Sequence, residues 1–171
     1  MDTLPGVSQL EGTPDLLRAL LDGISDEQTL WKAAPDRFSI AEVLEHLTHV
    51  ESHAFRLRVE RMVNEDHPFL EAYDQNAYAA AGQYSGREAD ESFAHWEEQR
   101  EDNVAYLKSL PLSAGARTAA HQELGDITVS QLLNEWAFHD LGHIRQIAEI
   151  VRAIRYYPHM GPFASQYKIN P

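Results

Sequence analysis

Hydrophobic side chains recur at the three- and four-residue spacing of an amphipathic helix in four long stretches of the chain. The first stretch covers about residues 14–25 and carries four leucines at this spacing. Thr13 precedes it as the expected N-cap, and Pro14 suits the first helical turn, where a backbone N–H is not needed. We therefore predict that the first helix begins at Pro14 and that residues 1–12 form an N-terminal extension.

The second stretch opens with a capping box. Ser39 and Glu42 stand three residues apart ahead of an apolar run, so each side chain can satisfy a backbone N–H at the start of a helix. The pattern continues to about Asn64. On a helical wheel its apolar side consists of the following residues: Ile40, Val43, Leu44, Leu47, Val50, Ala54 and Leu57.

A third helix is predicted over about residues 88–110, ended by Pro111. Thr128 and Gln131 form a second capping box and begin a fourth helix that extends to about Arg155. No stretch shows the apolar–polar alternation of a strand over a useful length. The four helices predict an all-α fold, a four-helix bundle.

The connections decide how such a bundle is threaded. Up-down-up-down is the simplest topology, but the two long connections also permit crossovers. Within the first of these connections a short helix is expected at 76–81. The tail, about residues 156–171, is rich in tyrosine and proline, and we expect it to pack on the bundle or on a neighbouring subunit. Residues 1–171 are predicted to form a single domain, with a homodimer as a possible assembly.

Composition narrows the function. A chain of 171 residues, 43% of them hydrophobic, suits one domain with a sizeable core. The start resembles no signal peptide, and no apolar run reaches the roughly 18 residues of a membrane span. A net charge of −13 without a basic stripe argues against nucleic acid and anionic membranes as partners. Because the chain has no cysteine, disulfides and a cysteine nucleophile are excluded, and a cytoplasmic protein is expected.

The candidate chemistry lies in the fourth helix. His143 falls within its apolar arc and His139 lies roughly 40° from that arc on the same side, so the two imidazoles face the core one turn apart. This i, i+4 pairing is the one that helical zinc sites use. On the second helix His46 is the best-oriented third ligand, with His49 and His53 in reserve. Three neutral imidazoles would leave coordination positions open and suit zinc, nickel, iron or copper.

Two acidic residues of the fourth helix are candidates for proton transfer. Asp140 projects into the apolar arc, where an unpaired carboxylate is costly, so it either orients a ligand histidine or bonds Arg145, a threonine or a tyrosine. Glu135 flanks the His139 face and could reach a bound water. The ordinary alternatives are that the histidines are hydrogen-bonded core residues and that Glu135 is a solvated helix edge.

Other metalloenzyme motifs fit poorly. The run HDLGH resembles the HExxH motif of metalloproteases, but its aspartate is shorter than glutamate and points inward on the wheel. The chain contains no Glu-x-x-His motif of the kind that di-iron bundles require. It also lacks the glycine-rich nucleotide loops and the GxSxG motif of serine hydrolases.

The segments RFSIAEVLEHLTHVE and, about ninety residues later, NEWAFHDLGHIRQI resemble the DinB-like family of DinB/YfiT-like metal enzymes. The resemblance extends to TPDLLRALLDGISDEQ and to MGPF near the end, and so covers nearly the whole chain. It implies a four-helix bundle, often dimeric, that holds a metal through one histidine of the second helix and an HxxxH pair of the fourth. These positions are His46, His139 and His143. His49 replaces an acidic residue common in the family and could add a fourth ligand.

The resemblance also implies the class of activity. Relatives include thiol-dependent S-transferases and isomerases, and others are described as metal-dependent hydrolases. The leading hypothesis is a metal-dependent enzyme that uses an external low-molecular-weight thiol on a small-molecule substrate, with zinc or nickel favoured and iron also compatible. A hydrolase that activates water, with Glu135 or Asp140 handling protons, is the second. A non-catalytic bundle that binds a metal or a small molecule is the third.

Overall fold

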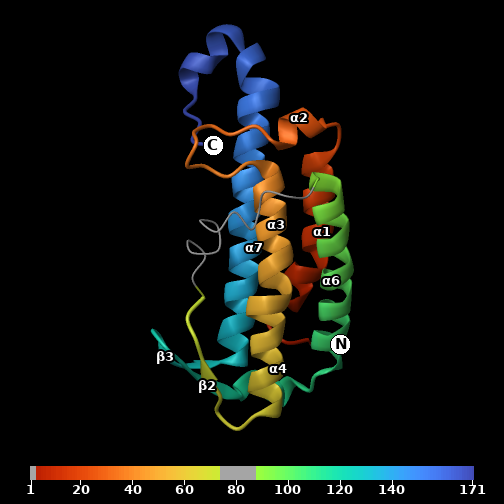
Figure 1. Cartoon of the computed structure of the whole chain (residues 1–171), viewed down its shortest axis with the longest axis vertical. Helices are drawn as coiled ribbons and strands as arrows, with labels where there is room; N and C mark the ends of the chain where they lie inside the picture. Colours follow the sequence, from red (N-terminus) through yellow and green to blue (C-terminus); the bar gives the residue numbers. More distant parts are fainter. Residues whose placement is uncertain (1–2, 74–87) are drawn as a thin grey trace.

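The computed structural model describes residues 3–73 and 88–171, which fold as the predicted four-helix bundle (Figure 1). The short helix expected at 76–81 lies outside the described residues. Between and after the long helices lie short helical turns: α2 (Asp26–Thr29), η2 (Leu112–Ala116), η4 (Tyr157–His159) and η5 (Gly161–Gln166). The long elements are α1 (Val7–Leu21), α3 (Ile40–Val50), η1 (Glu51–Arg56), α4 (Leu57–Asn64), α6 (Ala89–Ser109), α7 (Val129–Val151) and η3 (Arg152–Tyr156).

The helices are threaded with a crossover rather than in the simple up-down-up-down order. α3 packs along α6, and α1 packs along α7. Figure 1 shows that α1 and α7 run toward the end of the bundle where the C-terminus lies, whereas α3, α4 and α6 run away from it. Each packed pair is therefore parallel. Consecutive long helices cannot all be antiparallel neighbours in this arrangement.

Both predicted capping boxes are present. The Ser39 hydroxyl accepts a hydrogen bond from the backbone N–H of Glu42, whose carboxylate accepts one from the N–H of Ser39. Thr128 and Gln131 make the same reciprocal pair at the start of α7. These local devices fix where the two histidine-bearing helices begin.

The prediction that the first helix begins at Pro14 is wrong, because α1 already begins at Val7. Thr13 is buried inside the helix, and its hydroxyl donates to the carbonyl of Gln9 rather than capping an N-terminus. Pro14 lacks the N–H that would bond the carbonyl of Leu10. That carbonyl accepts a hydrogen bond from the Arg100 guanidinium instead, so the proline leaves no buried acceptor unsatisfied.

The residues expected to form an N-terminal extension contribute to the core. Leu4, Val7 and Leu10 are buried against α7 and α6. Gly6, the N-cap of α1, has a φ of 80°, and a side chain there would lie 2.6 Å from the carbonyl oxygen of Leu133. Glycine thus permits the start of α1 to approach the backbone of α7 closely.

The second long helix is interrupted by a turn of π-helix, η1, between α3 and α4. A π-turn takes more residues per turn than an α-helix, so every later side chain is rotated relative to a regular wheel. Leu57, predicted to be in the core, is therefore 48% exposed, whereas Phe55, Val59 and Met62 are buried. The wheel is correct through Ala54, which is also buried, and wrong at Leu57.

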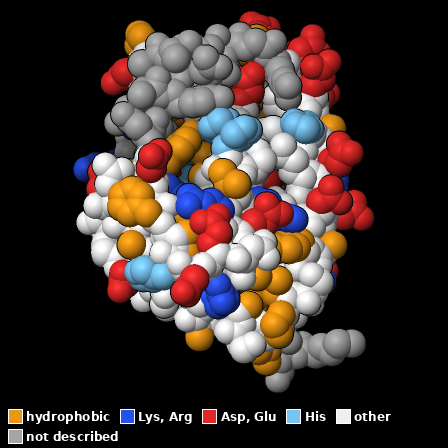
Figure 2. Space-filling view, turned by 60° about the horizontal axis from the view of Figure 1, so that its bottom comes forward, with side chains coloured by type: hydrophobic (Ala, Val, Ile, Leu, Met, Phe, Trp, Pro, Cys, Tyr) orange, Lys and Arg blue, Asp and Glu red, His pale blue; other side chains and the backbone are white. Residues whose placement is uncertain are grey.

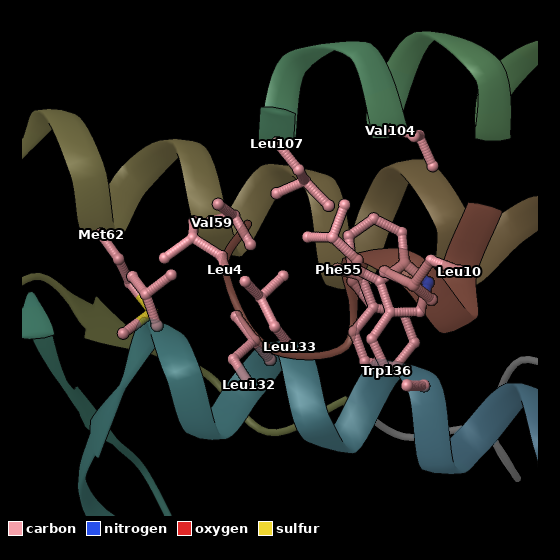
Figure 3. Packing of buried hydrophobic residues seen from close by; sticks show 14 of the residues in the cluster. Leu4, Leu10, Phe55, Val59, Met62, Val104, Leu107, Leu132, Leu133 and Trp136 are labelled. Atoms are coloured by element: carbon pink, nitrogen blue, oxygen red, sulfur yellow. The ribbon is translucent and has the colours of Figure 1, made fainter. Parts of the chain in front are cut away.

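The lower part of the bundle contains the larger of two hydrophobic clusters. Phe55 from η1 stacks on Trp136 from α7, with ring centroids 4.9 Å apart. Figure 3 shows Val104 and Leu107 of α6 covering this pair from the opposite side. The cluster fixes the distance between the second and fourth long helices immediately below the histidines.

A small sheet, which the sequence pattern did not reveal, closes this end of the bundle. Strand β1 (Phe69–Leu70) pairs in parallel with β2 (Thr118–His121), which pairs antiparallel with β3 (Gly125–Thr128). Strands of two to four residues are too short to show a recognisable alternation. The β2–β3 hairpin leads directly into α7.

The tail after η3 turns back on itself through η4 and η5, and the backbone N–H of Asn170 bonds the carboxylate of Glu149. Its aromatic side chains remain largely in solvent, with Phe163 72% exposed. Among the described residues, no helix combines the length and the apolar character needed to cross a membrane.

Candidate metal centre

The three histidines singled out in the sequence meet between α3 and α7. Nε2 of His139 lies 3.1 Å from Nε2 of His46 and 3.2 Å from Nε2 of His143. The rings of His46 and His143 are 4.7 Å apart between centroids. Within the described part of the chain, these three form the one group of histidine and acidic side chains whose ligand atoms are close enough to share an ion.

The spacing of the nitrogens fits a tetrahedral cation. Zinc–nitrogen bonds of about 2.0–2.1 Å at tetrahedral angles place the ligand atoms roughly 3.3 Å apart, close to the contacts of His139. His46 is buried, and the other two rings are half-buried. A set of three imidazoles also leaves at least one coordination position for a reacting group.

The histidines are held in their neutral form. Burial, followed by the neighbouring imidazoles, lowers the pKa of His46 to about 2. Burial, followed by His143 and Arg100, lowers the pKa of His139 to about 3. Burial also lowers the pKa of His143. At neutral pH the rings therefore carry lone pairs, as metal ligands must.

Gln146 fixes the tautomer of His143. Its amide oxygen lies 2.9 Å from Nδ1 of His143, one turn earlier on the same helix. Because an amide oxygen only accepts, the hydrogen is on Nδ1 and the lone pair of Nε2 points toward His139. Without a metal, a single hydrogen can then bridge His139 Nε2 to only one of its two neighbouring nitrogens, and the other contact lacks a hydrogen. A cation would satisfy all three nitrogens. The donor set thus fits a metal ion better than a hydrogen-bonded histidine cluster.

Gln146→Leu is expected to weaken zinc binding about 10- to 100-fold, because an orienting partner of a ligand histidine is lost. Gln146→Glu keeps an acceptor at the same place and should bind zinc about as tightly as the native chain. Competition titration with a chromogenic chelator measures both affinities. Equal affinities for the leucine and native proteins would show that Gln146 does not orient His143.

The lowered pKa values of the buried histidines make the metal-free protein sensitive to acid. The folded-state pKa values of His46 and His139 lie below the ordinary value of about 6.5, so the unfolded chain binds more protons as the pH falls. The free energy of unfolding should decrease below about pH 6.5, by up to about 1.4 kcal/mol per pH unit for each histidine. Urea unfolding at pH 7 and pH 5 tests this. His46→Gln should show a smaller decrease, and an unchanged decrease would contradict the assignment.

The two reserve histidines lie outside the cluster. His49 and His53 stack on each other, with ring centroids 4.4 Å apart, and His49 also lies beside Tyr73. Nδ1 of His53 contacts the hydroxyl of Ser52. The structure thus places His49 apart from the three nitrogens that converge, and a fourth histidine ligand receives no support.

A cavity of about 650 Å³ opens beside the histidines. Figure 2 views the molecule toward the end that carries the hairpin, where histidine, hydrophobic and charged side chains lie beside one another. The volume is typical of sites for small molecules. Its described lining comprises His46, Val50, Ala54, Phe55, Arg58, Ala72, Tyr73, His121, Glu123, Leu124, Asp126, Ile127, Gln131, Leu132, Glu135 and His139.

The two acidic candidates have different surroundings. Glu135 lines the cavity one turn before His139 and is exposed. Asp140 does not line it. Its carboxylate is 1% exposed and accepts hydrogen bonds from the Arg100 guanidinium, at 2.5 Å and 3.2 Å. Arg100 thus takes the place of the expected ligand histidine or Arg145, whereas the expectation of a threonine partner is confirmed by a side-chain hydrogen bond with Thr13. Asp140 is therefore poorly placed to exchange protons with a substrate.

Arg100 is the centre of a buried ionic network that the sequence reasoning missed. Its guanidinium also donates twice, at 2.7 Å, to the carboxylate of Glu51. Trp136 and Asn103 donate to the same carboxylate. Asp140 and Glu51 together raise the pKa of Arg100 against the effect of burial, so this cation stays charged. The network joins α1, η1, α6 and α7 beneath the histidines.

A four-helix bundle whose second and fourth long helices bring three histidines together is the arrangement that the sequence resemblance implied. Residues 9–147 match the family model of the DinB superfamily. The chain therefore belongs to the DinB superfamily.

The chain is also similar to two individual proteins, one in sequence and one in fold. It is 28% identical over 152 residues to the uncharacterized protein YuaE of Bacillus subtilis (strain 168), a match that covers 78% of this chain and 90% of YuaE. Its fold resembles that of YfiT from Bacillus subtilis, with a TM-score of 0.77, 21% identity, and coverage of 87% of this chain and 85% of YfiT. YfiT is described as a probable metal-dependent hydrolase with an unusual four-helix bundle topology.

Proposed function

We propose that this protein is a metal-dependent hydrolase of a small molecule, with zinc as the first candidate metal and His46, His139 and His143 as its ligands. The observation that carries the proposal is the convergence of three neutral imidazole nitrogens, two of them from rings that line an open cavity, those of His46 and His139. The description of YfiT as a probable metal-dependent hydrolase supports the same class of activity. Nickel and iron are compatible with the same ligands.

The residues around the cavity would have different roles in such a reaction. A divalent ion held by the three nitrogens would supply a Lewis acid, the chemistry that polarises carbonyl groups and lowers the pKa of water. Glu135, on the same face of α7 one turn from His139, would accept a proton from the attacking water and donate it to the leaving group. Phe55 and Leu132 contribute apolar surface that holds the body of the substrate and excludes bulk water.

The thiol-dependent activity remains a second proposal. The cavity is large enough for a low-molecular-weight thiol beside an electrophile, and the chain has no cysteine of its own to serve as the nucleophile. The same cation would lower the pKa of the bound thiol instead of that of water. The two activities thus differ in the co-substrate and share the metal ligands.

One experiment separates these activities. Full-length protein purified without a polyhistidine tag is analysed for its metal, loaded with zinc, and assayed on activated esters and amides with and without an added thiol. Hydrolysis without thiol supports the hydrolase, and turnover that requires the thiol supports the transferase. Glu135→Gln should lower kcat for hydrolysis about 100-fold while zinc content stays unchanged. Absence of turnover in both assays would leave a non-catalytic binding bundle.

A further inference from the structure

Arg58 is a half-buried cation on the wall of the cavity, away from the histidines. Its neighbours on the same helical stretch, Arg56 and Arg61, each form an ion pair with a glutamate four residues later. The residue four positions after Arg58 is Met62, which cannot pair with it. Within the described residues Arg58 makes no ion pair, and the one acceptor recorded for its guanidinium is the carbonyl of Glu71, at 2.8 Å.

Because only the carbonyl of Glu71 is recorded as an acceptor among the described residues, most of the N–H groups of Arg58 are available to a ligand. A guanidinium has five N–H groups in a planar fork, which matches the two oxygens of a carboxylate. Burial lowers the pKa of Arg58, and the charge of Glu135, which lines the same cavity, opposes that effect. A counter-ion supplied by a ligand would offset the cost of holding the cation partly out of water.

The position of Arg58 defines the shape of such a ligand. Twelve residues of nearly continuous helix separate it from His46, a rise of about 18 Å between the two backbones, which the long arginine side chain can shorten to a gap on the order of 10 Å. Val50 and Ala54 line the cavity between them, and Phe55 and Leu132 add apolar surface. The cavity wall between Arg58 and the histidines thus contains apolar side chains.

We propose that Arg58 binds a carboxylate of the substrate, at the end of an apolar body whose other end reaches His46 and His139. The proposal rests on the proposed function only in naming the ligand as substrate, because the contact with Arg58 does not involve the metal. A single negative charge fits best. Glu123, Asp126 and Glu135 also line the cavity and would repel a dianionic phosphate more strongly. Figure 2 shows basic side chains near the centre of this face beside acidic ones.

The test compares ligands that share one chain length. Monomethyl suberate carries one carboxylate, dimethyl suberate none, and methyl 8-aminooctanoate an ammonium group. Calorimetric titration into the full-length protein, both zinc-loaded and after zinc removal, should show monomethyl suberate binding about ten-fold more tightly than dimethyl suberate. Arg58→Met, which keeps the apolar stem, should abolish this preference. Arg61→Met, which removes an arginine one turn later that is paired with Glu65, should retain it.

Three results would overturn the proposal. They are equal affinities of the two suberates for the native protein, a preference that survives in Arg58→Met, and tighter binding of the ammonium ligand. Octyl phosphate binding more tightly than monomethyl suberate would assign the site to a phosphate instead. Because the comparison holds in zinc-free protein, it stands even where the hydrolase assay fails.

Discussion

Replacing Arg100 with methionine is expected to lower the free energy of unfolding by about 3–5 kcal/mol. The substitution keeps much of the side-chain volume but leaves the carboxylates of Glu51 and Asp140 buried without their cation. It also removes the donor to the carbonyl of Leu10, which Pro14 cannot serve. Urea unfolding at pH 7, monitored by far-UV circular dichroism, measures the loss.

Arg18 provides a matched control. It also contacts two carboxylates, those of Asp15 and Glu97, but its side chain is 59% exposed. Arg18→Met should therefore lower the free energy of unfolding far less than Arg100→Met, since solvent screens exposed ion pairs. A similar loss in both variants would mean that burial does not set the strength of the Arg100 network.

The chemical cause of the Arg100 effect can be separated from loss of packing. Adding Glu51→Gln and Asp140→Asn to Arg100→Met removes the unpaired charges, and the triple variant should regain part of the lost stability. In Arg100→Met alone, the pKa of Asp140, which burial raises, stays above its unfolded value, so the unfolded state binds fewer protons and the deficit should shrink as the pH falls from 7 to 5. A deficit independent of pH would indicate a cavity instead of unpaired charge.

The same network shows where sequence reasoning reaches its limit. Glu51 lies seven residues after Leu44, and Arg100 lies between Trp96 and Val104, so both charges occupy core-facing positions of their helices. Opposite charges on the buried faces of two helices are a detectable signal of an internal ion pair. The sequence does not reveal which helices are adjacent, because a helical wheel describes each helix alone.

The helix boundaries were likewise predicted correctly only where a local signal determines them. Capping boxes are local, and both were predicted correctly at Ser39 and Thr128. Pro14, by contrast, was interpreted by a local rule as a helix start, whereas a distant arginine satisfies the acceptor that it leaves. The π-turn at η1 has the same origin in tertiary packing, since it brings Phe55, five residues after Val50, onto the same buried side. A regular wheel cannot anticipate either feature.

The histidine trio was predictable because its geometry is set before these irregularities. His46 precedes η1 on a regular stretch of α3, and His139 and His143 lie on the uninterrupted helix α7. Their directions therefore followed from the wheels alone. His53 lies within η1, where a regular wheel no longer holds, and its ring stacks with that of His49 outside the cluster.

His139→Ala is expected to weaken zinc binding by at least 100-fold and to abolish zinc-dependent turnover. His139 is the central member of the trio, since its Nε2 contacts both of the others, so its loss leaves two nitrogens from different helices. Loss of a direct ligand should exceed the 10- to 100-fold effect typical of orienting partners. Chelator competition and elemental analysis of the untagged protein measure the affinity and the bound zinc.

His49→Ala is the matched control, because it removes an imidazole from the histidine-bearing part of α3 outside the cluster. It should retain the affinity for zinc within a few-fold, and unchanged thermal unfolding of each metal-free variant would show that the fold survives. Stoichiometric zinc at native affinity in His139→Ala would refute the three-histidine centre. Loss of zinc in His49→Ala with retention in His139→Ala would move the site toward His49 and His53. Because each substitution removes one imidazole but only the ring of His139 faces the converging nitrogens, their contrast tests the geometry and not the number of histidines in the chain.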